Sequence, residues 1–551
     1  MNEFRDPTQW SYHAWRDEEA GMPRLRPSLC LTAAILLLAA SAGLMRGLVE
    51  SMIGHPLSPG EVMQLLLVRW GLGWMGLCFL GWGVCDFLPG AQGPRLLLSW
   101  ILLMPMMVPF GFLGYGTDPD TWAVAFNADW MHRIGGYSMS RPPGFPLYEG
   151  LVAVLKPLGG WPTLFSAQLL AGLAATIAWL WLPDEIATLR KRMIAFGILV
   201  HPLFLLACGT GSEAIWQTSL VCLSTLFLSR SLASETHSLG GYFLSGLALG
   251  ASAGFRMTSL ALVPTWLLVI VVFEQTHIRR FLGAAVVLMA SLGIYCLAEI
   301  PVWMTAGGDA FQYFREDPDT RVVLYRLLRY SLPPPLLVLL AIALWRVRKD
   351  WDDFEDSEKA LCVVSILNSL VLAGVFLLFP RESGNLAVAI PFLILLVGLV
   401  LPAKILCVGF PCLALWGFIS FPLLPPNAAQ SPQLVLNPTA GPLVEEISGR
   451  FDQMRRSQRL LLASPRIPTI YIVAHDWPIL AVQRPDWVVE KGVLRNPDAP
   501  VEFRDWMDYA SFKERRGSGT RFYVVGDAGK ATSRRFGYDL YEEWASAWNP
   551  Q

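Results

Sequence analysis

Acidic and basic residues gather in a few short segments of a chain that is otherwise strongly apolar. Two aspartates flank a proline in GTDPDTW, residues 116–122, and an arginine opens the proline-rich corner of SRPPGFP, residues 140–146. A carboxylate can act as a general base towards a hydroxyl group, and a guanidinium group can pair with two oxygens of a phosphate. Asp118 and Asp120 are therefore candidate catalytic bases, and Arg141 is a candidate phosphate ligand.

Three further charged residues stand at the ends of long apolar runs. Glu213 lies in GTGSEAIW, Arg256 in GASAGFRMTS and Arg381 in FPRESGNL. Ionisable groups at membrane depth are costly and usually functional, and arginines at such positions suit a lipid phosphate. Simpler explanations exist, because a carboxylate stabilises the start of a helix and an arginine at a helix end can reach lipid headgroups.

The Asp-Pro-Asp sequence also has a structural explanation. An aspartate caps a helix, a proline fits its first turn, and a second acid interacts favourably with the helix dipole. The same DPDT sequence recurs at residues 317–320, which favours capping. The sequence by itself therefore leaves capping and catalysis open for Asp118.

The composition places these residues in a membrane protein. Of the 551 residues, 54% are hydrophobic and 16% are charged, whereas soluble proteins are about 25% charged. The net charge of -1 gives no large field that would attract nucleic acid, so no nucleic-acid partner is expected. The nine cysteines show no metal-binding spacing and are interpreted as packing residues.

Apolar runs long enough to cross a bilayer predict about thirteen transmembrane helices. They lie near residues 27–49, 62–88, 95–114, 161–182, 194–209, 211–232, 239–255, 257–273, 281–303, 325–346, 359–379, 385–402 and 403–424.

The distribution of arginine and lysine predicts the orientation of these helices. Basic residues precede the first run and recur in alternate loops, as in Arg190–Arg192 and Arg279–Arg280, so those loops and the N-terminus are expected in the cytoplasm. Residues 115–160, here named the outer loop, and everything after residue 425 are then expected outside. A site in the outer loop faces away from nucleotide sugars, so its substrate must arrive within the membrane.

The composition changes near residue 425, which divides the chain into expected regions. The tail alternates runs typical of strands, at 469–475, 487–494 and 521–527, with runs typical of helices, at 503–516 and 538–548, which predicts a small α/β domain. The expected regions are a cytoplasmic tail (1–26), an N-terminal transmembrane hairpin (27–94), a transmembrane catalytic module (95–424) and a soluble periplasmic or lumenal domain (425–551).

Several of these motifs together resemble a known superfamily. Asp118 to Ala123, with Trp122, fits an acidic motif in an outer loop, and Tyr137 to Pro146 fits a following Y-x-x-S-R-x-P-G-x-P pattern. GSEAIW, the small-residue helix ending in Phe255-Arg256, and PRESGNLAVAIPFL complete the pattern. The chain is similar to the GT-C superfamily of polytopic glycosyltransferases, in the branch of protein O-mannosyltransferases and lipid A aminoarabinose transferases. It departs from many members because the acidic loop follows the third predicted helix rather than the first.

The resemblance implies a polytopic α-helical fold and an inverting transfer of a sugar from a polyprenyl-phosphate donor at the outer face. The acceptor would be a lipid, a glycan or a protein. Asp118 would be the base, with Asp120 as the second choice, while Glu213 would orient the sugar or acceptor. Arg141, Arg256 and Arg381 would bind the phosphate. No dedicated metal-binding spacing is present, so no cofactor is expected, although carboxylates could bind Mg²⁺ or Mn²⁺.

Other classes of protein remain open at this stage. A transporter or flippase for a lipid-linked sugar would carry charges in mid-membrane and repeated halves, whereas these charges crowd the outer ends. A polysaccharide polymerase or ligase would use a similar outer site, and the tail could serve as a receptor or structural domain. No Asn-X-Ser/Thr sequon with a permitted middle residue occurs, which favours a bacterial inner membrane.

Overall fold

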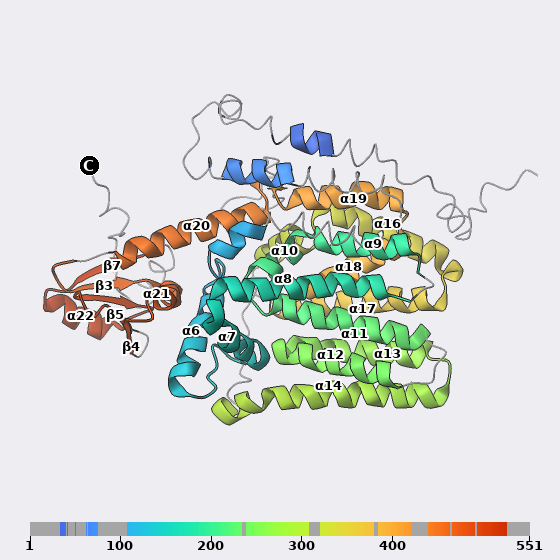
Figure 1. Cartoon of the computed structure of the whole chain (residues 1–551), viewed down its shortest axis with the longest axis horizontal. Coiled ribbons are helices and arrows are strands. Elements are labelled where there is room, and N and C mark those ends of the chain that lie inside the picture. The colour runs from blue at the N-terminus through green and yellow to red at the C-terminus, as the bar shows by residue number, and fades with distance from the viewer. Residues whose placement is uncertain are drawn as a thin grey trace, which may run out of the picture.

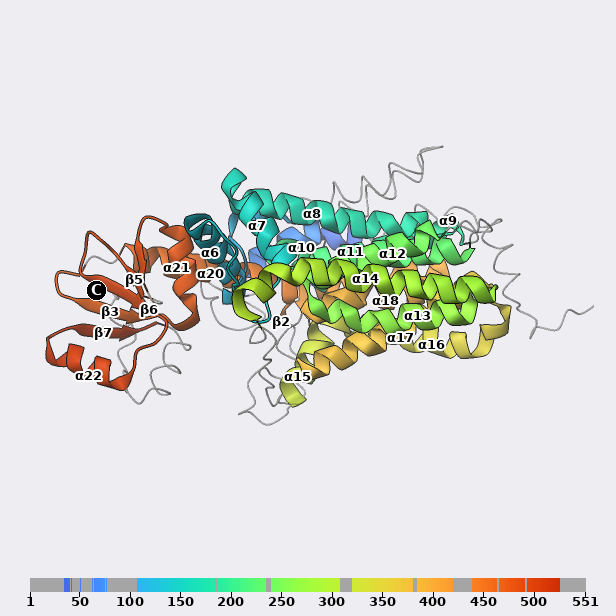
Figure 2. The same cartoon turned by 90° about the horizontal axis from the view of Figure 1, so that it is seen from below.

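A bundle of long helices carries a small sheet domain at one end in the computed structural model of the chain (Figures 1 and 2). The predicted hairpin at 27–94, the linker after residue 420, Arg381 and the expected helix at 538–548 fall wholly or largely outside the described residues. The structure describes residues 34–39, 41, 50, 62, 64–74, 76, 107–183, 186–233, 239–307, 320–379, 384–420, 439–462, 465–490, 493–525.

The helices of the bundle follow the apolar runs of the sequence. Their bounds are α8 Trp161–Ala178, α9 Thr188–Leu199, α10 Pro202–Gly209, α11 Ala214–Ala233, α12 Gly240–Phe255, α13 Val263–Phe273, α14 His277–Ala306, α15 Thr320–Arg326, α16 Pro334–Asp350, α17 Asp356–Leu378, α18 Gly384–Val400 and α19 Ala403–Trp416.

Some of these helices are long enough to cross a membrane without interruption. Within the described residues, three helical stretches meet the length and hydropathy of a span, at Trp161–Trp181, His277–Ala306 and Asp356–Leu378. Two bent pairs extend this number to five if each pair is one span, α9 with α10 at 61° and Val323–Ser331 with Pro334–Asp353 at 82°. The protein is thus mostly helical with several apolar helices, while a total of about thirteen spans stays a prediction.

The bend between α9 and α10 has a local cause. Pro202 starts α10 and cannot continue the hydrogen bonding of α9, and His201 caps the new helix through Nδ1, which accepts from the Leu203 amide at 3.2 Å. His201 is fully buried, and its Nε2 lies 3.3 Å from the carbonyl oxygen of Ser331. Both ring nitrogens of His201 therefore have polar partners within the core.

The outer loop folds into two helices at the end of the bundle that faces the sheet domain (Figure 2). Helix α6 spans Pro119–Ile134 and α7 spans Pro146–Gly159. Gly135 ends α6 with φ of 66°, a left-handed conformation that glycine adopts without strain. The two helices pack against each other, and α6 also contacts a helix of the sheet domain.

The sheet domain combines parallel and antiparallel strands in the order β4-β5-β6-β3-β7. β3 pairs in parallel with β6 and β7, whereas β5 pairs antiparallel with β4 and β6. The element bounds are α20 Pro442–Leu461, β3 Thr469–Ile472, α21 Trp477–Gln483, β4 Val488–Glu490, β5 Val493–Arg495, β6 Val501–Arg504, α22 Tyr509–Gly517 and β7 Arg521–Val524.

The expected α/β tail is present, but two of its predicted elements differ. The run at 487–494 was expected as one strand and forms the antiparallel strands β4 and β5, with Val488 opposite Arg495. The run at 503–516 was expected as a helix, yet its first residues belong to β6 and the helix begins only at Tyr509. Asp508 caps that helix, because its side chain accepts from the Ser511 amide at 2.8 Å.

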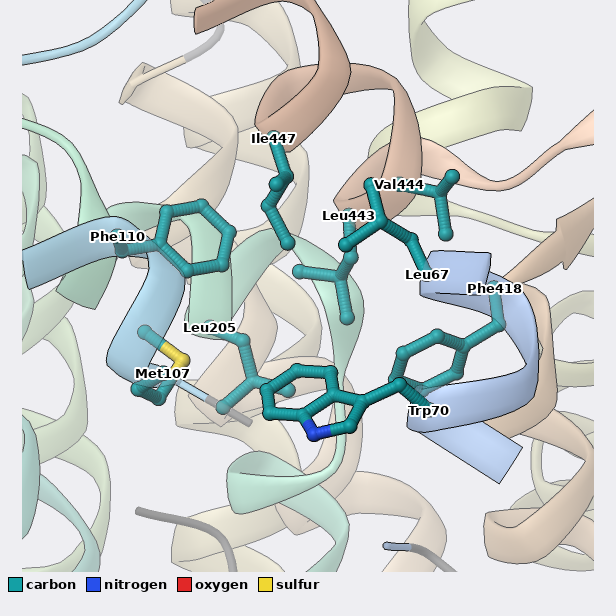
Figure 3. A pocket seen from close by; sticks show the side chains of 9 residues that line it. All are labelled: Leu67, Trp70, Met107, Phe110, Leu205, Phe418, Leu443, Val444 and Ile447. Carbon is teal, nitrogen blue, oxygen red and sulfur yellow. The ribbon is translucent and has the colours of Figure 1, made fainter. Parts of the chain in front are cut away.

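Helix α20 joins the sheet domain to the bundle. A short antiparallel pair, β1 (Ile419–Ser420) with β2 (Thr439–Ala440), leads from α19 into α20. One hydrophobic core extends through the bundle and includes the first turns of α20, whereas the sheet has core clusters of its own. The apolar side chains that meet at this junction (Figure 3) are Leu67, Trp70, Met107, Phe110, Leu205, Phe418, Leu443, Val444 and Ile447.

Candidate active site

The start of α6 positions the first candidate carboxylates. Asp118 is the N-cap of α6, Pro119 occupies the first turn, and Asp118 Oδ1 accepts from the Asp120 amide at 3.0 Å. The predicted capping role of Asp118 is therefore real. The side chains of Asp118 and Asp120 also both remain exposed to solvent, so capping leaves them accessible to a substrate.

Surrounding groups alter the ionisation of Asp118. Desolvation by the surrounding protein raises the pKa of the Asp118 carboxyl above its ordinary value, although the side chain keeps contact with solvent. The nearby Asp120 carboxylate raises the pKa further, while the helix-start amide and Arg141 oppose both effects. A carboxylate with a raised pKa is a stronger base than an ordinary aspartate once it is ionised.

Helix α20 holds the segment that immediately precedes Asp118. Glu446 accepts from the Thr117 amide at 3.0 Å and from the Thr117 hydroxyl at 2.6 Å. Arg450 is fully buried, pairs with Glu446 at 2.7 Å and donates to the Gly114 carbonyl oxygen at 3.0 Å. Burial disfavours the charge of Glu446, but Arg450 and the Thr117 hydrogen bonds hold its pKa below the usual range.

Glu149 of α7 organises the proline-rich corner. Its carboxylate accepts from the Tyr137 hydroxyl, from the Ser140 amide at 2.7 Å and hydroxyl at 2.5 Å, and from the Phe145 amide at 3.2 Å. The corner contains a cis peptide bond between Pro142 and Pro143. Sequence reasoning identified this corner as rigid but missed Glu149, whose only signal is an acid in the first turn of an apolar helix.

The corner directs Arg141 into a chain of alternating charges. Arg141 pairs with Asp120, and its Nη2 lies 3.7 Å from Glu213 Oε1. The same Glu213 oxygen lies 2.6 Å from Arg256 Nη1, and both guanidinium groups lie over the Phe145 ring, at 4.8 and 5.9 Å. Burial disfavours the charge of Arg141, but Glu213 and Asp120 hold its pKa above the ordinary value.

The tertiary structure surrounds Glu213 and Arg256 with protein. Glu213 is 1% exposed and Arg256 is 4% exposed, so Arg256 is enclosed by protein rather than extended towards headgroups. Glu213 does more than begin α11, since its carboxylate pairs with Arg256. Five of the six candidate residues therefore lie together, namely Asp118, Asp120, Arg141, Glu213 and Arg256.

The first turn of α18 closes one side of the cluster. A Cβ at Gly384 would lie only 2.7 Å from Arg256 Nη1, so the backbone of α18 runs directly beside the guanidinium group. Arg381, the sixth candidate, precedes this turn but lies outside the described residues, and its phosphate-binding role stays a prediction.

Tyr148 is a further polar group of the site that the sequence did not single out. Its side chain is fully buried in α7, and its hydroxyl has no hydrogen-bond partner among the described residues. Burial, followed by the charge of Glu213, raises its pKa well above the ordinary value, so the hydroxyl stays protonated. A buried phenol next to the charged cluster can donate a hydrogen bond to an anionic ligand.

Metal-binding geometry is not evident where the chain is described. Within those residues, no group of three or more histidine, cysteine, aspartate or glutamate side chains lies close enough together to hold an ion.

Comparison with known proteins bears on the fold. No family model and no curated protein matches the chain. Among the solved structures that resemble it are two of ArnT from Cupriavidus metallidurans, in the apo state and bound to undecaprenyl phosphate. The apo structure is 12% identical with a TM-score of 0.46 and covers 82% of this chain and 90% of its own. The bound structure is 13% identical with a TM-score of 0.47 and covers 80% and 89%.

The similarity concerns the fold. The chemistry proposed for this chain rests on its own side chains.

Proposed function

We propose that this protein is an integral-membrane glycosyltransferase of the GT-C type. It transfers a sugar from a polyprenyl-phosphate donor to an acceptor hydroxyl at the outer face of a bacterial inner membrane. The observation that carries the proposal is the convergence of Asp120, Arg141, Glu213 and Arg256 beside the exposed Asp118 at one end of an apolar bundle. A base and paired guanidinium groups at the end of membrane-crossing helices suit a substrate whose lipid lies in the bilayer.

Asp118 fits the role of general base better than Asp120. Asp120 forms an ion pair with Arg141, whereas Asp118 takes part in no ion pair among the described residues. Asp118 would accept the proton of the acceptor hydroxyl while that oxygen attacks the anomeric carbon of the sugar. Asp120 would orient Arg141.

The departing group is a polyprenyl phosphate, which leaves with the electron pair of the broken carbon–oxygen bond. It needs cationic partners more than a proton donor, and Arg141 and Arg256 offer planar guanidinium groups for its oxygens. Arg381 is assigned to the same phosphate. Glu213 lies between Arg141 and Arg256 and would hold them at a spacing that a phosphate can bridge. Attack opposite the departing phosphate inverts the anomeric configuration.

The placement of charges favours an enzyme over a transporter. A flippase would need polar groups along a path through the membrane, whereas this cluster gathers where α11 begins and α12 ends. A polysaccharide polymerase or ligase would share the donor chemistry and differ in its acceptor. An assay that follows both donor cleavage and product separates these classes.

The proposal is tested by lipid analysis and by donor turnover. Lipid extracts of host cells with and without the gene are compared by mass spectrometry, and a glycosylated product is expected only with the gene. The purified full chain in liposomes is then given radiolabelled undecaprenyl-phosphate sugars with a host membrane extract. Release of undecaprenyl phosphate supports transfer, whereas movement of the intact donor across the bilayer would identify a transporter.

A further inference from the structure

A groove of about 320 Å³ lies between the outer loop and the sheet domain, beside the charged cluster. Helix α6 and residues 138–140 form one wall, and α21 and β4 form the other. The two sides are held together by an edge-to-face contact of Phe126 with Trp477, at 4.9 Å, and by a hydrogen bond from Arg133 to the Pro485 carbonyl oxygen, at 2.7 Å. Residues of the outer loop and of the sheet domain therefore form the groove together.

The groove lies next to the candidate catalytic residues in the sequence of α6 and of the proline-rich corner. Ala123, Asn127 and Trp130 of α6 line it, and their spacing continues the helix face on which Asp120 lies. On the same wall, Ser140 directly precedes Arg141. A ligand in the groove would thus extend from the start of α6, where the base is proposed, towards the sheet domain.

The lining combines aromatic surfaces with hydrogen-bonding groups. Phe126, Trp130 and Trp477 supply rings, while Asn127 and Ser138 supply polar atoms. Trp130 is 38% exposed although it is a large apolar side chain, and its indole ring has a donor N–H. A sugar ring has apolar C–H faces and a polar edge of hydroxyl groups, so its recognition requires this mixture of flat apolar surfaces and polar atoms.

We propose that this groove binds a sugar ring of a glycan acceptor and holds its hydroxyl towards Asp118. The inference rests on the proposed transfer reaction and specifies its acceptor class. The donor is assigned to the opposite side, because Arg256 and Glu213 stand at the ends of α12 and α11 in the apolar bundle. The groove instead opens between α6 and the sheet domain, where a polar glycan could enter it.

Binding of chitobiose and cellobiose to the full chain in nanodiscs tests the proposal, measured by saturation-transfer NMR. We expect saturation of the ring C–H protons by the wild type. Trp130→Ala should weaken binding about tenfold, equivalent to about 1.4 kcal/mol, whereas Trp130→Phe should keep most of the binding because an aromatic face remains. Trp506→Ala is the matched control, since Trp506 is an exposed tryptophan, at 52%, in the sheet domain outside the groove.

Three results would overturn the acceptor groove. The first is equal disaccharide binding by Trp130→Ala and the wild type, and the second is no disaccharide binding by either protein. The third is preferential binding of a Gly-Ser-Thr peptide, which would assign the groove to a protein segment. Donor cleavage is measured separately on the same samples. Loss of acceptor-dependent transfer in Trp130→Ala with unchanged donor hydrolysis supports the acceptor groove. Absence of donor turnover in the wild type would reject the proposed transferase activity. In that case the sugar-binding result would be judged by itself.

Discussion

At the scale of single residues, Asp118 combines a structural task with a proposed chemical one. Its carboxylate caps α6 and is exposed to solvent, while desolvation by the surrounding protein and the charge of Asp120 raise its pKa. A folded-state pKa above the unfolded value means that the native protein binds this proton more tightly. Ionisation at neutral pH therefore lowers the free energy of unfolding, and stability falls as pH rises between the unfolded and folded pKa values.

Replacing Asp118 separates its capping of α6 from its proposed role as a base. Asn caps a helix about as well as Asp but cannot accept the proton. We expect Asp118→Asn to reach the membrane, to unfold at the same or a higher temperature at neutral pH, and to lose at least about a hundredfold in transfer rate. Asp120→Asn should lose less. Thermal unfolding and donor turnover measure both effects, and near-normal turnover by Asp118→Asn would leave Asp118 as a cap alone.

The pH dependence of transfer gives an independent check on the same residue. Because a base must be ionised, the rate should fall as pH decreases through the raised pKa of Asp118, above the range of an ordinary aspartate. Initial rates across the acidic range measure this midpoint. A midpoint in the ordinary aspartate range would argue against Asp118 as the titrating base.

The arginines of the cluster are predicted to need their planar shape as well as their charge. Arg141→Lys and Arg256→Lys each keep a positive charge but lose the fork that binds two oxygens at once. We expect both variants to lose transfer activity, and we expect the same of Arg381→Lys. Arg455→Lys, on the exposed face of α20, is the matched control. Wild-type turnover in the Arg141 and Arg256 variants would remove the phosphate assignment.

At the scale of elements, close approach of α18 to the cluster can be tested with one methyl group. Gly384→Ala places a Cβ 2.7 Å from Arg256 Nη1, so the guanidinium group must move while the backbone can stay. We expect lower donor turnover with little loss of stability. Gly374→Ala in α17 is the control, because no described side chain lies within 4 Å of the position that its methyl group would take. Equal effects of the two variants on turnover would argue against a role for the Arg256 position.

Helix α20 is the element that steadies the segment before Asp118. The folded-state pKa of Glu446 is depressed, so its contribution to stability is present above the unfolded pKa and is lost as pH falls through the folded pKa. Glu446→Gln should lower the unfolding temperature at neutral pH and flatten its decline in acid, because Arg450 is left buried without its anionic partner. Glu514→Gln, an exposed acid in α22, should change neither property.

At the scale of the whole molecule, the sheet domain and the outer loop lie at the same end of the bundle (Figure 2). The positive-inside pattern predicts that this end is periplasmic and that the N-terminus is cytoplasmic. With an impermeant thiol reagent, Asp498→Cys in the sheet domain should be labelled in intact spheroplasts. Lys349→Cys in the last turn of α16 should be labelled only once the membrane is opened. Labelling of Asp498→Cys solely from the cytoplasmic side would overturn the orientation and the site that depends on it.

The sequence by itself determined the properties that depend on neighbouring residues. Apolar runs of sufficient length mark α8, α14 and α17, because each of these helices satisfies its backbone hydrogen bonds within its own segment, as a bilayer requires. The cap at Asp118 and the proline-rich corner beyond Ser140 are equally local, so the residue types in these short segments are enough to predict them. The resemblance to glycosyltransferases also came from such short segments.

Tertiary structure decided what depends on distant partners. Thr117 and Glu446 meet although they are 329 residues apart, and Arg256 reaches Glu213 across 43 residues. The hairpin of β4 and β5 was missed because a strand is completed by hydrogen bonds to another strand, so an apolar run does not reveal where the chain reverses. A local pattern specifies which residues can form a helix or carry a charge, but only packing brings carboxylates, guanidinium groups and an aromatic groove close to one another.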